Sequence, residues 1–219
     1  LLAAAGVDTV QVRVPHLRLL RARPSGDAII DAAAECIAEA IEAAGGVAVV
    51  KEPEAGLEPG LTDASVDAVI VIGGTGSGRA DASVRTLARV GEVVAHGIGL
   101  LPGETTAFGM VDARPVLAVP GRLDAALAAW HILGWVMLIR LAGSGEPLRL
   151  RTAKLTHKVS STVGLSELVP MRCEGLLGTP IATGYLPLSA LAQANGWIFI
   201  KPESEGYPEG TEVVVRPWP

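Results

Sequence analysis

The sequence has little cysteine, few aromatic residues and no excess of positive charge. Its two cysteines, Cys36 and Cys173, provide neither a disulfide framework nor a metal-binding cluster, and they suit a reducing cytoplasm. Phenylalanine, tryptophan and tyrosine make up only 4% of the 219 residues, so we expect the core to rely on small side chains. A net charge of -5 argues against a nucleic-acid-binding protein. With 49% hydrophobic residues, the composition indicates one medium globular domain or two small ones.

Several catalytic motifs are also missing. The sequence contains no HExxH, CxxC or GxSxG, which excludes the standard templates for zinc proteases, dithiol redox enzymes and serine hydrolases. The four histidines, His16, His96, His131 and His157, are scattered one to a segment. His96 ends a predicted strand on the side where a ligand is expected, but we interpret it as structural, and His131 as a core histidine.

The most distinctive stretch is residues 67–81, which read DAVIVIGGTGSGRAD. Its first part, Ala68 to Ile72, is a short β-branched run that predicts a strand buried on both faces. A helical pattern begins after Asp81. The turn between them consists of Gly73, Gly74, Thr75, Gly76, Ser77 and Gly78. A strand, a glycine-rich turn and a helix start are typical of an anion site, because glycine allows close backbone approach and free N–H groups point at the ligand.

Neither standard glycine motif fits this stretch. The Walker A motif requires Lys and then Ser or Thr after its last glycine, whereas Arg79 and Ala80 stand there. The Rossmann motif has a different glycine spacing and lies at the first strand of its fold. The residues alone therefore leave both a ligand-binding loop and a plain tight turn open. Asp81 likewise has two interpretations, as a helix cap or as a cation ligand beside a bound phosphate.

The flanking segments predict an α/β fold. A helix with apolar residues at helical spacing is expected between an N-cap at Asp27 and a stop at Gly45, and Cys36 is expected to be buried inside it. Strands are expected at residues 47–50 and 92–96. Alternating strands and helices predict a doubly wound, mostly parallel sheet with helices on both faces. Ligands bind beyond the carboxyl ends of such strands, where the glycine-rich turn falls.

A second helix, residues 122–141, is apolar on more than one face. It carries no Asp, Glu, Lys or Arg between Asp124 and Arg140. Because it is shorter than the roughly 20 apolar residues of a membrane span, we expect it to pack between the sheet and a second subunit of a homodimer. The basic run at residues 16–23 is interpreted as a solvated strand end, with an anion clamp as the alternative.

The chain divides after this helix. Residues 144–147 predict a linker between an α/β domain at residues 1–143 and a small, mainly β domain at residues 148–219. The chain begins without Met and shows no cleavable signal, so we expect further residues upstream.

Three runs occur in a distinctive order: VIVIGGTGSGRAD, then HGIGLLPGETTAFG, then VLAVPGRLDAA. Together they resemble the MoeA family of molybdenum cofactor biosynthesis, the molybdopterin molybdotransferases. The closing stretch PLSALAQANGWIFIKPESEGYPEGTEVVV is similar to the β-domain that ends this family. The resemblance covers nearly all of the chain and corresponds to domains III and IV of the family. It implies a MogA/MoeA-type doubly wound sheet followed by a small β-domain.

The resemblance also implies a site. In this family the third domain binds molybdopterin, and the enzyme inserts molybdate while AMP leaves an adenylylated pterin. Carried over by position, Gly73 to Gly78 would hold the phosphates, and Asp81 would be a catalytic residue and Mg²⁺ ligand, with Asp27 as the second catalytic candidate. The other implied ligand-binding residues are Ser25, Gly26, Pro102, Gly103, Pro120, Gly121 and Arg122.

The sequence departs from the family at two turns. The family reads Lys-Pro-Gly-Lys where this chain has Leu101 and Glu104 around its Pro-Gly, and Pro-Gly-Asn-Pro where residues 120–123 read PGRL. Each charge-assisted contact is worth about 1.5–3 kcal/mol, so the loss of two lysines should weaken anion binding. Arg79 and Arg122 are the candidates to replace that charge.

Three functions are compatible with these observations. The first is an enzyme-like protein of molybdenum cofactor assembly that binds molybdopterin or its adenylylated form, molybdate and Mg²⁺. The second is a carrier or sensor that binds molybdopterin without turnover, and the third is a scaffold. We expect a cytoplasmic homodimer with no nucleic-acid or membrane partner.

Overall fold

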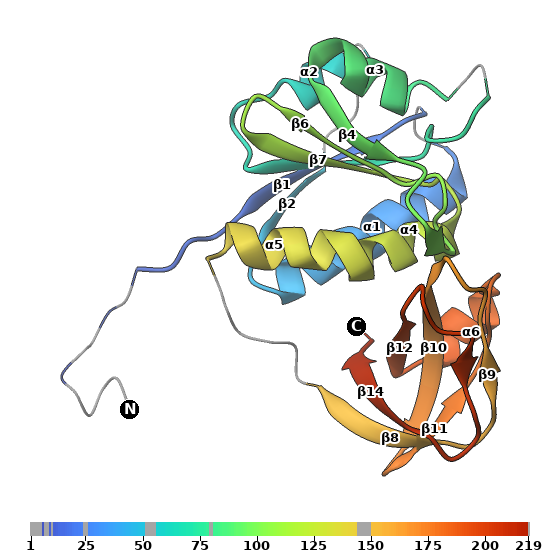
Figure 1. The fold of residues 1–219 in the computed structure, drawn as a ribbon. Coiled ribbons are helices and arrows are strands. Elements are labelled where there is room, and N and C mark those ends of the chain that lie inside the picture. Colours follow the sequence, from blue (N-terminus) through green and yellow to red (C-terminus); the bar gives the residue numbers. More distant parts are fainter. Residues whose placement is uncertain are drawn as a thin grey trace.

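The computed structural model describes residues 6, 9, 11–23, 26–50, 56–78, 81–143 and 150–218. Two six-stranded sheets form the body of the molecule, with the α/β part above the β part in Figure 1. The first sheet has the strand order β2-β1-β3-β7-β6-β4. Its strands are β1 (His16–Arg21), β2 (Val47–Val50), β3 (Ala68–Ile72), β4 (Glu92–His96), β6 (Ala107–Val111) and β7 (Arg114–Val119). Strands β2, β1, β3 and β7 run parallel to one another, whereas the pairs β7–β6 and β6–β4 are antiparallel.

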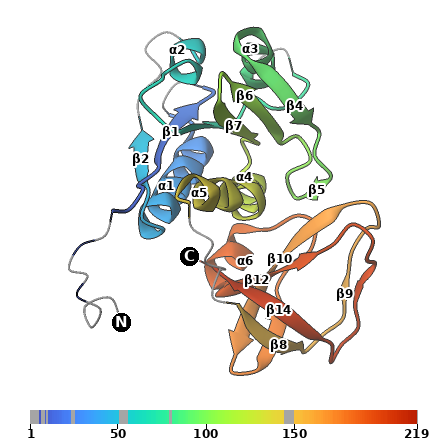
Figure 2. The same ribbon diagram turned by 60° about the vertical axis from the view of Figure 1, so that its left-hand side comes forward.

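Helices cover both faces of this sheet, as the sequence predicted. One face packs against α1 (Ala28–Ala43) and against a long helix made of α4 (Leu123–Ala129), the π-helical turn η2 (Trp130–Gly134) and α5 (Trp135–Leu141). The other face packs against α2 (Glu58–Leu61) and α3 (Ser83–Val90). Figures 1 and 2 show the two layers from different sides. The fully buried strand β3 lies at the centre because both of its faces are apolar.

Helix α1 begins and ends where the sequence predicted. The Asp27 carboxylate accepts hydrogen bonds from the backbone N–H groups of Ile29 and Ile30, and Gly45 has a φ of +83° just beyond the C-cap. Cys36, however, is exposed. The expectation that it is buried was wrong, because it lies outside the stripe of Ile30, Ala33, Ala34, Ile37, Ala40 and Ile41 that contacts the sheet.

The basic run before α1 is also corrected. Rather than a solvated strand end, residues 16–21 form β1 between β2 and β3, and four of these residues are buried. Two arginines on this strand are neutralised by ion pairs. Arg18 contacts Asp63 at 2.5 Å, and Arg21 contacts Asp31 at 2.8 Å. Their side chains therefore support the fold.

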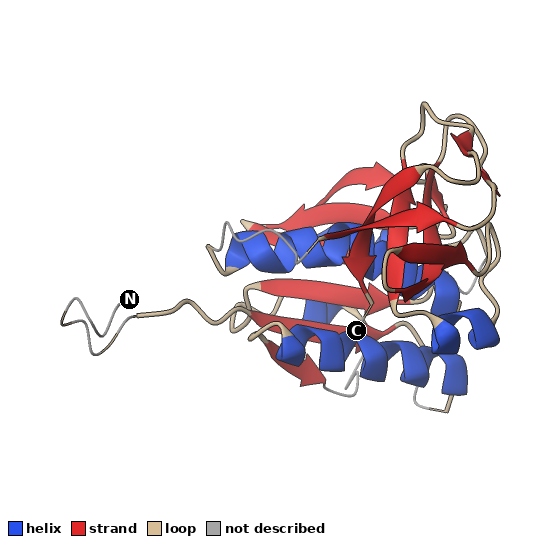
Figure 3. Cartoon of the chain, turned by 90° about the horizontal axis from the view of Figure 1, so that it is seen from below, coloured by secondary structure: helices blue, strands red, loops and turns tan. Residues whose placement is uncertain are grey.

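The C-terminal part is mainly β, as predicted (Figure 3). Its sheet has the order β11-β8-β14-β12-β10-β5, and β11 also pairs with β10. Its elements are β5 (Leu100–Leu101), β8 (Arg151–Leu155), β10 (Ser166–Glu174), β11 (Leu177–Pro180), α6 (Leu188–Gln193), β12 (Gly196–Ile200) and β14 (Glu212–Pro217). A separate pair consists of β9 (Val159–Ser160) and β13 (Gly206–Tyr207).

The two parts are joined by more than the connecting segment. Strand β5 precedes the long helix in the chain but pairs in parallel with β10. The buried Asp124 carboxylate on α4 accepts a hydrogen bond from the backbone N–H of Leu186 in the second part. One apolar core includes α1, α4 and Trp197 on β12. The expected linker at residues 144–147 lies outside the described residues.

The long helix lies mostly inside the molecule. Residues Leu123–Leu141 are long and apolar enough to cross a membrane by length and composition, with a mean hydropathy of 1.3. The fold buries 61% of that window, which is typical of a core helix.

Candidate functional site at the strand ends

A cavity of about 380 Å³ lies at the carboxyl ends of β1, β3 and β7. This is the edge of a parallel α/β sheet where ligands bind. The cavity is lined by Arg23, Asp27, Ile30, Gly73, Gly74, Thr75, Gly76, Asp81, Thr105, Pro120, Gly121 and Arg122. Three turns meet here: the start of α1, the glycine-rich loop after β3, and the Pro-Gly turn between β7 and α4.

The near side of the glycine-rich loop is held by two hydrogen bonds to Gly73. The Gly73 N–H donates to the Val119 carbonyl, and the buried Ser83 hydroxyl donates to the Gly73 carbonyl at 2.7 Å. Gly73 and Gly74 have φ values of +90° and +67°, a region that side chains rarely adopt. A Cβ on Gly74 would also lie 2.6 Å from the Ser83 hydroxyl oxygen. Both the positive φ and the close contact with Ser83 therefore require glycine at position 74.

The far side of the loop is held by side chains. The hydroxyl groups of Thr75 and Thr105 are hydrogen bonded at 2.9 Å, and His96 Nε2 lies 3.0 Å from the Thr75 carbonyl oxygen. His96 therefore positions the loop. Among the described residues, the backbone N–H groups of Gly74, Thr75 and Gly76 find no acceptor. These groups are available to an anionic ligand.

Asp81 does not cap the following helix, contrary to one of its two interpretations. The N-cap of α3 is Ala82, and no side chain bonds to the first turn. The Asp81 carboxylate turns back instead, and its Oδ2 accepts a hydrogen bond from the Gly78 N–H at 3.1 Å. A Cβ on Gly76 would lie 2.7 Å from the same oxygen. The carboxylate thus lies against the loop, where it can hold a cation beside a bound anion.

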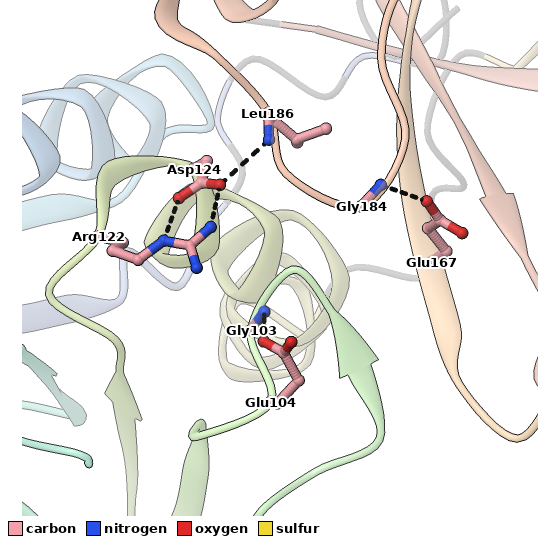
Figure 4. Close-up of polar contacts among 7 residues, drawn as sticks. All are labelled: Gly103, Glu104, Arg122, Asp124, Glu167, Gly184 and Leu186. Carbon is pink, nitrogen blue, oxygen red and sulfur yellow. Dashed lines mark hydrogen bonds and ion pairs between the residues drawn. The ribbon is translucent and has the colours of Figure 1, made fainter. Parts of the chain in front are cut away.

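The charges around the cavity are nearly balanced. Arg23 lies 3.8 Å from Asp27, whose carboxylate already caps α1. Arg122 binds the buried Asp124 through two hydrogen bonds, at 3.1 and 2.6 Å (Figure 4). The hydrogen bond to Asp124 raises the pKa of Arg122 above its usual value, and the charge of Glu104 adds to this effect. Arg122 therefore lines the cavity with much of its charge already compensated.

The turn where the family has two lysines supplies no cation here. The Glu104 carboxylate accepts a hydrogen bond from the Gly103 N–H at 3.0 Å (Figure 4), and Leu101 belongs to β5. Thr105, the next residue, reaches the cavity through its contact with Thr75. At this turn the chain therefore differs from the family both in its sequence and in the charge that it places near the cavity.

The structure brings most of the expected site residues together. Asp27, Asp81, Gly73, Gly74, Thr75, Gly76, Pro120, Gly121 and Arg122 line the cavity, whereas Gly26, Ser77, Gly78, Pro102 and Gly103 are outside its lining. Ser25 and Arg79 lie outside the described residues. Three lining residues were not predicted: Arg23, Ile30 and Thr105. Of these three, only Arg23 could have been found from the sequence, because it belongs to the basic run at residues 16–23 for which an anion clamp was the alternative interpretation.

Comparison with known proteins identifies the family. Residues 19–139 match the family described as "Probable molybdopterin binding domain", and every residue that lines the cavity falls in this range. Residues 152–218 match the "MoeA C-terminal region (domain IV)". The chain belongs to the MoeA-like molybdopterin biosynthesis family. The order of its two domains is the order that the sequence predicted.

Individual relatives agree with this assignment. A Methanocaldococcus jannaschii protein named for molybdopterin biosynthesis is 26% identical over 149 residues, covering 68% of this chain and 36% of its own length. The crystal structure of a molybdopterin biosynthesis MoeA protein from Pyrococcus horikoshii has 26% identity and a TM-score of 0.78, with 100% of this chain and 58% of that one covered. A molybdenum cofactor biosynthesis protein from Pyrococcus furiosus shares the fold, at 20% identity and a TM-score of 0.74 over 99% of this chain and 73% of that one. This MoeA-like chain therefore spans between about one third and three quarters of the length of these relatives.

Proposed function

We propose that the cavity at the strand ends binds the phosphate-bearing part of molybdopterin or of its adenylylated form. The observation that carries this proposal is the row of free N–H groups at Gly74, Thr75 and Gly76 in a matched molybdopterin-binding domain. Backbone N–H groups at the end of a buried strand bind phosphate without needing a lysine. The 380 Å³ cavity admits the phosphate end of such a ligand.

Mg²⁺ fits this site as a partner of the ligand. Proteins usually bind Mg²⁺ through one or two carboxylates together with substrate phosphates and water. Asp81 and Asp27 both line the cavity, and the described residues contain no cluster of three His, Cys, Asp or Glu that would hold a metal alone. We therefore assign Asp81 as the metal ligand, with Asp27 nearby. When bound, the ion would neutralise charge on the phosphates.

The chemistry that we propose is molybdate insertion with release of AMP. The chain contributes binding and orientation to this reaction, and no nucleophilic side chain is required. The loop N–H groups would hold the phosphates, Asp81 would hold the cation, and Arg122 would lie at the opposite wall. A second candidate is a carrier that binds molybdopterin without turnover. Glu104 favours it, because this anion stands where the family has a lysine.

Calorimetric titration tests the proposal. The purified chain is titrated with molybdopterin and with adenylylated molybdopterin, each with and without Mg²⁺, and AMP is measured after molybdate is added. We expect binding of both ligands that Mg²⁺ strengthens. Asp81→Asn should remove the Mg²⁺ effect and leave the unfolding transition nearly unchanged, because the side chain is only half buried.

The matched control is Asp112→Asn, which removes a carboxylate that is 89% exposed from a hairpin turn. It should bind as the parent chain does. AMP release would indicate an active molybdotransferase, and binding without release would indicate a carrier. Absence of binding to either ligand would reject the proposed site, and an unchanged Mg²⁺ effect in Asp81→Asn would reject the role of Asp81.

We also propose that the chain forms a homodimer through the outer side of α5. A groove of about 550 Å³ lies between this helix and the β6–β7 hairpin, lined by Phe108, Met110, Leu117, Leu133 and Val136 among others. Val136 is 47% exposed on this apolar surface. Sedimentation velocity should show a dimer that Val136→Lys converts to a monomer, and a monomeric parent chain would contradict the proposal.

A cytoplasmic location suits the free thiols of Cys36 and Cys173.

A further inference from the structure

A second cavity, of about 170 Å³, lies at the opposite end of α1 from the glycine-rich loop. Its lining comes from the end of α1, the long helix and the C-terminal strands, and includes Trp130, His131, Trp135, Trp197 and Trp218. The sequence contains four tryptophans, and all of them are in this lining. In a chain with only 4% aromatic residues, their concentration around one small space points to a specific role.

The aromatic wall is assembled from both parts of the molecule. Trp130 and Trp135 come from the long helix, Trp197 comes from β12, and Trp218 follows β14. The His131 ring lies between the two parts, with its centre 5.8 Å from that of Trp197 and 4.9 Å from that of Trp218. The cavity therefore exists only when the two domains are docked.

The long helix changes its winding where it borders the cavity. In η2 the Trp135 N–H donates to the Trp130 carbonyl, five residues earlier, in place of the usual four. Single π-helical turns of this kind are frequent at functional sites. Gly134 permits this arrangement, because a Cβ there would overlap the Trp130 ring. The π turn thus belongs to the construction of the cavity.

Two buried nitrogen atoms of the lining have no hydrogen-bond partner among the described residues: Trp130 Nε1 and His131 Nε2. Trp130 is 1% exposed and His131 is 8% exposed. An unsatisfied buried polar group costs about 1–3 kcal/mol, and solvent reaches neither nitrogen, so the packing of these two rings lowers the stability of the fold. Burial also lowers the pKa of His131 to about 4, so the imidazole is neutral at pH 7 and the lining has no charge.

The cavity has an entrance and the volume of a single ring. Ala43 and Pro217 are exposed at its edge, while Ala40, Trp130, His131 and Trp197 are buried at its base. An apolar cavity of roughly 150 Å³ is large enough to hold benzene. We infer that this cavity binds a small uncharged aromatic molecule, which packs against the tryptophans that line it.

This site is separate from the proposed molybdopterin site. Ile30 of α1 lines the first cavity and Ala44 the second, which places them about 20 Å apart along the helix axis at 1.5 Å per residue. Because the aromatic cavity is formed by both domains, a ligand there should stabilise their docking. The inference does not depend on the proposed function.

Phenol is a suitable probe, because it carries one ring and one hydroxyl group. We expect titration of the ¹⁵N-labelled chain to shift the indole N–H signals, that of Trp130 most, with a saturable dissociation constant of about 0.01–1 mM. Cyclohexanol, which has the hydroxyl group but no aromatic ring, should bind at least about tenfold more weakly. Toluene, which lacks the hydroxyl group, should bind at least as tightly as phenol, because the cavity is lined by apolar surfaces. Indole signals that do not move in phenol would overturn the inference, as would equal binding of phenol and cyclohexanol.

Variants distinguish the cavity from a general surface effect. Ala44→Leu places a larger side chain in the lining and should weaken phenol binding at least tenfold. Glu42→Leu adds the same side chain at an exposed position of α1 and should leave binding unchanged. His131→Phe keeps an aromatic ring in the wall of the cavity, so it should retain phenol binding. Equal phenol affinities in Ala44→Leu and the parent would contradict the site.

Discussion

The two ends of α1 border two cavities, one formed mainly by backbone groups and the other by side chains. At the N-terminal end, the glycine-rich loop presents backbone N–H groups, and the lining contains two arginines and two aspartates. At the C-terminal end, indole rings surround a space whose lining has no charged side chain at neutral pH. The first cavity is defined by main-chain conformation within one domain. The second is defined by side chains that two domains bring together.

This difference decides what each cavity tolerates. A site made from backbone is lost when a side chain is introduced, because the positive φ values and the close approaches leave no room for one. A site made from side chains depends instead on packing, on the neutrality of its histidine and on domain docking. Substitutions can therefore affect one cavity and leave the other intact.

The largest expected effect comes from Gly74→Ala. The new Cβ must adopt a φ of +67° and would lie 2.6 Å from the Ser83 hydroxyl oxygen, whose hydrogen bond to Gly73 holds the loop. Together the left-handed conformation and the lost bond should cost about 2–5 kcal/mol of unfolding free energy. Molybdopterin binding should disappear, whereas phenol binding should persist below the melting temperature. Denaturant unfolding and the two titrations measure these effects.

Gly45→Ala is the control for this change. Gly45 has a φ of +83° at the other end of α1, and no atom lies within 4 Å of the place that a Cβ would occupy. It should cost only the conformational term, about 1–2 kcal/mol, and both ligands should still bind. If Gly45→Ala destabilised the chain as much as Gly74→Ala, the contact with Ser83 would not be the cause.

The second effect is a pH dependence that originates at the aromatic cavity. His131 has a pKa of about 4 in the folded chain, compared with 6.5 for an ordinary histidine. Between pH 6.5 and 4, His131 binds a proton in the unfolded chain but not in the folded chain. The free energy of unfolding therefore falls as the pH is lowered towards 4. The loss approaches about 3 kcal/mol. Urea unfolding at pH 7, 6, 5 and 4 measures it.

His131→Phe provides the comparison for this experiment, because all other titrating groups are unchanged in the variant. We expect its stability to fall less than that of the parent chain between pH 6.5 and 4. The difference between the two curves then isolates the contribution of the histidine. Parallel curves for the two proteins would show that His131 is not the group responsible.

The smallest expected effect is on affinity at the polar cavity. Glu104→Lys replaces an exposed anion by a cation near Arg122, at the turn where the family has lysine. Solvent screens this exposed position, so we expect molybdopterin to bind only about tenfold more tightly, with a gain that salt reduces. Glu209→Lys makes the same charge change in an exposed turn before β14. Equal gains in both variants would attribute the effect to net charge alone.

Much of the fold was predictable from local patterns. The β-branched run Ala68–Ile72 became the buried central strand, and the apolar spacing between Asp27 and Gly45 became α1 with the expected ends. The place of the glycine-rich turn was also predictable. Alternating strands and helices indicate a parallel sheet, and the turn follows a strand of that sheet, so it lies at the carboxyl edge where ligands bind. The prediction failed at Cys36, which faces solvent because of its orientation on α1. For Asp81 the residues left a helix cap and a cation ligand open, and its carboxylate bonds to the Gly78 N–H instead of capping α3.

The sequence by itself determined the order of elements, the family and the position of the glycine-rich loop, because these depend on local conformation and on spacing along the chain. Only the tertiary structure decided how charge is distributed around that loop, since Arg122 is held by Asp124 and Glu104 by its own turn. It alone gathered the four tryptophans, which are separated by up to 88 residues in the sequence, between Trp130 and Trp218. Long-range packing across two domains leaves no local pattern from which such a cavity can be predicted.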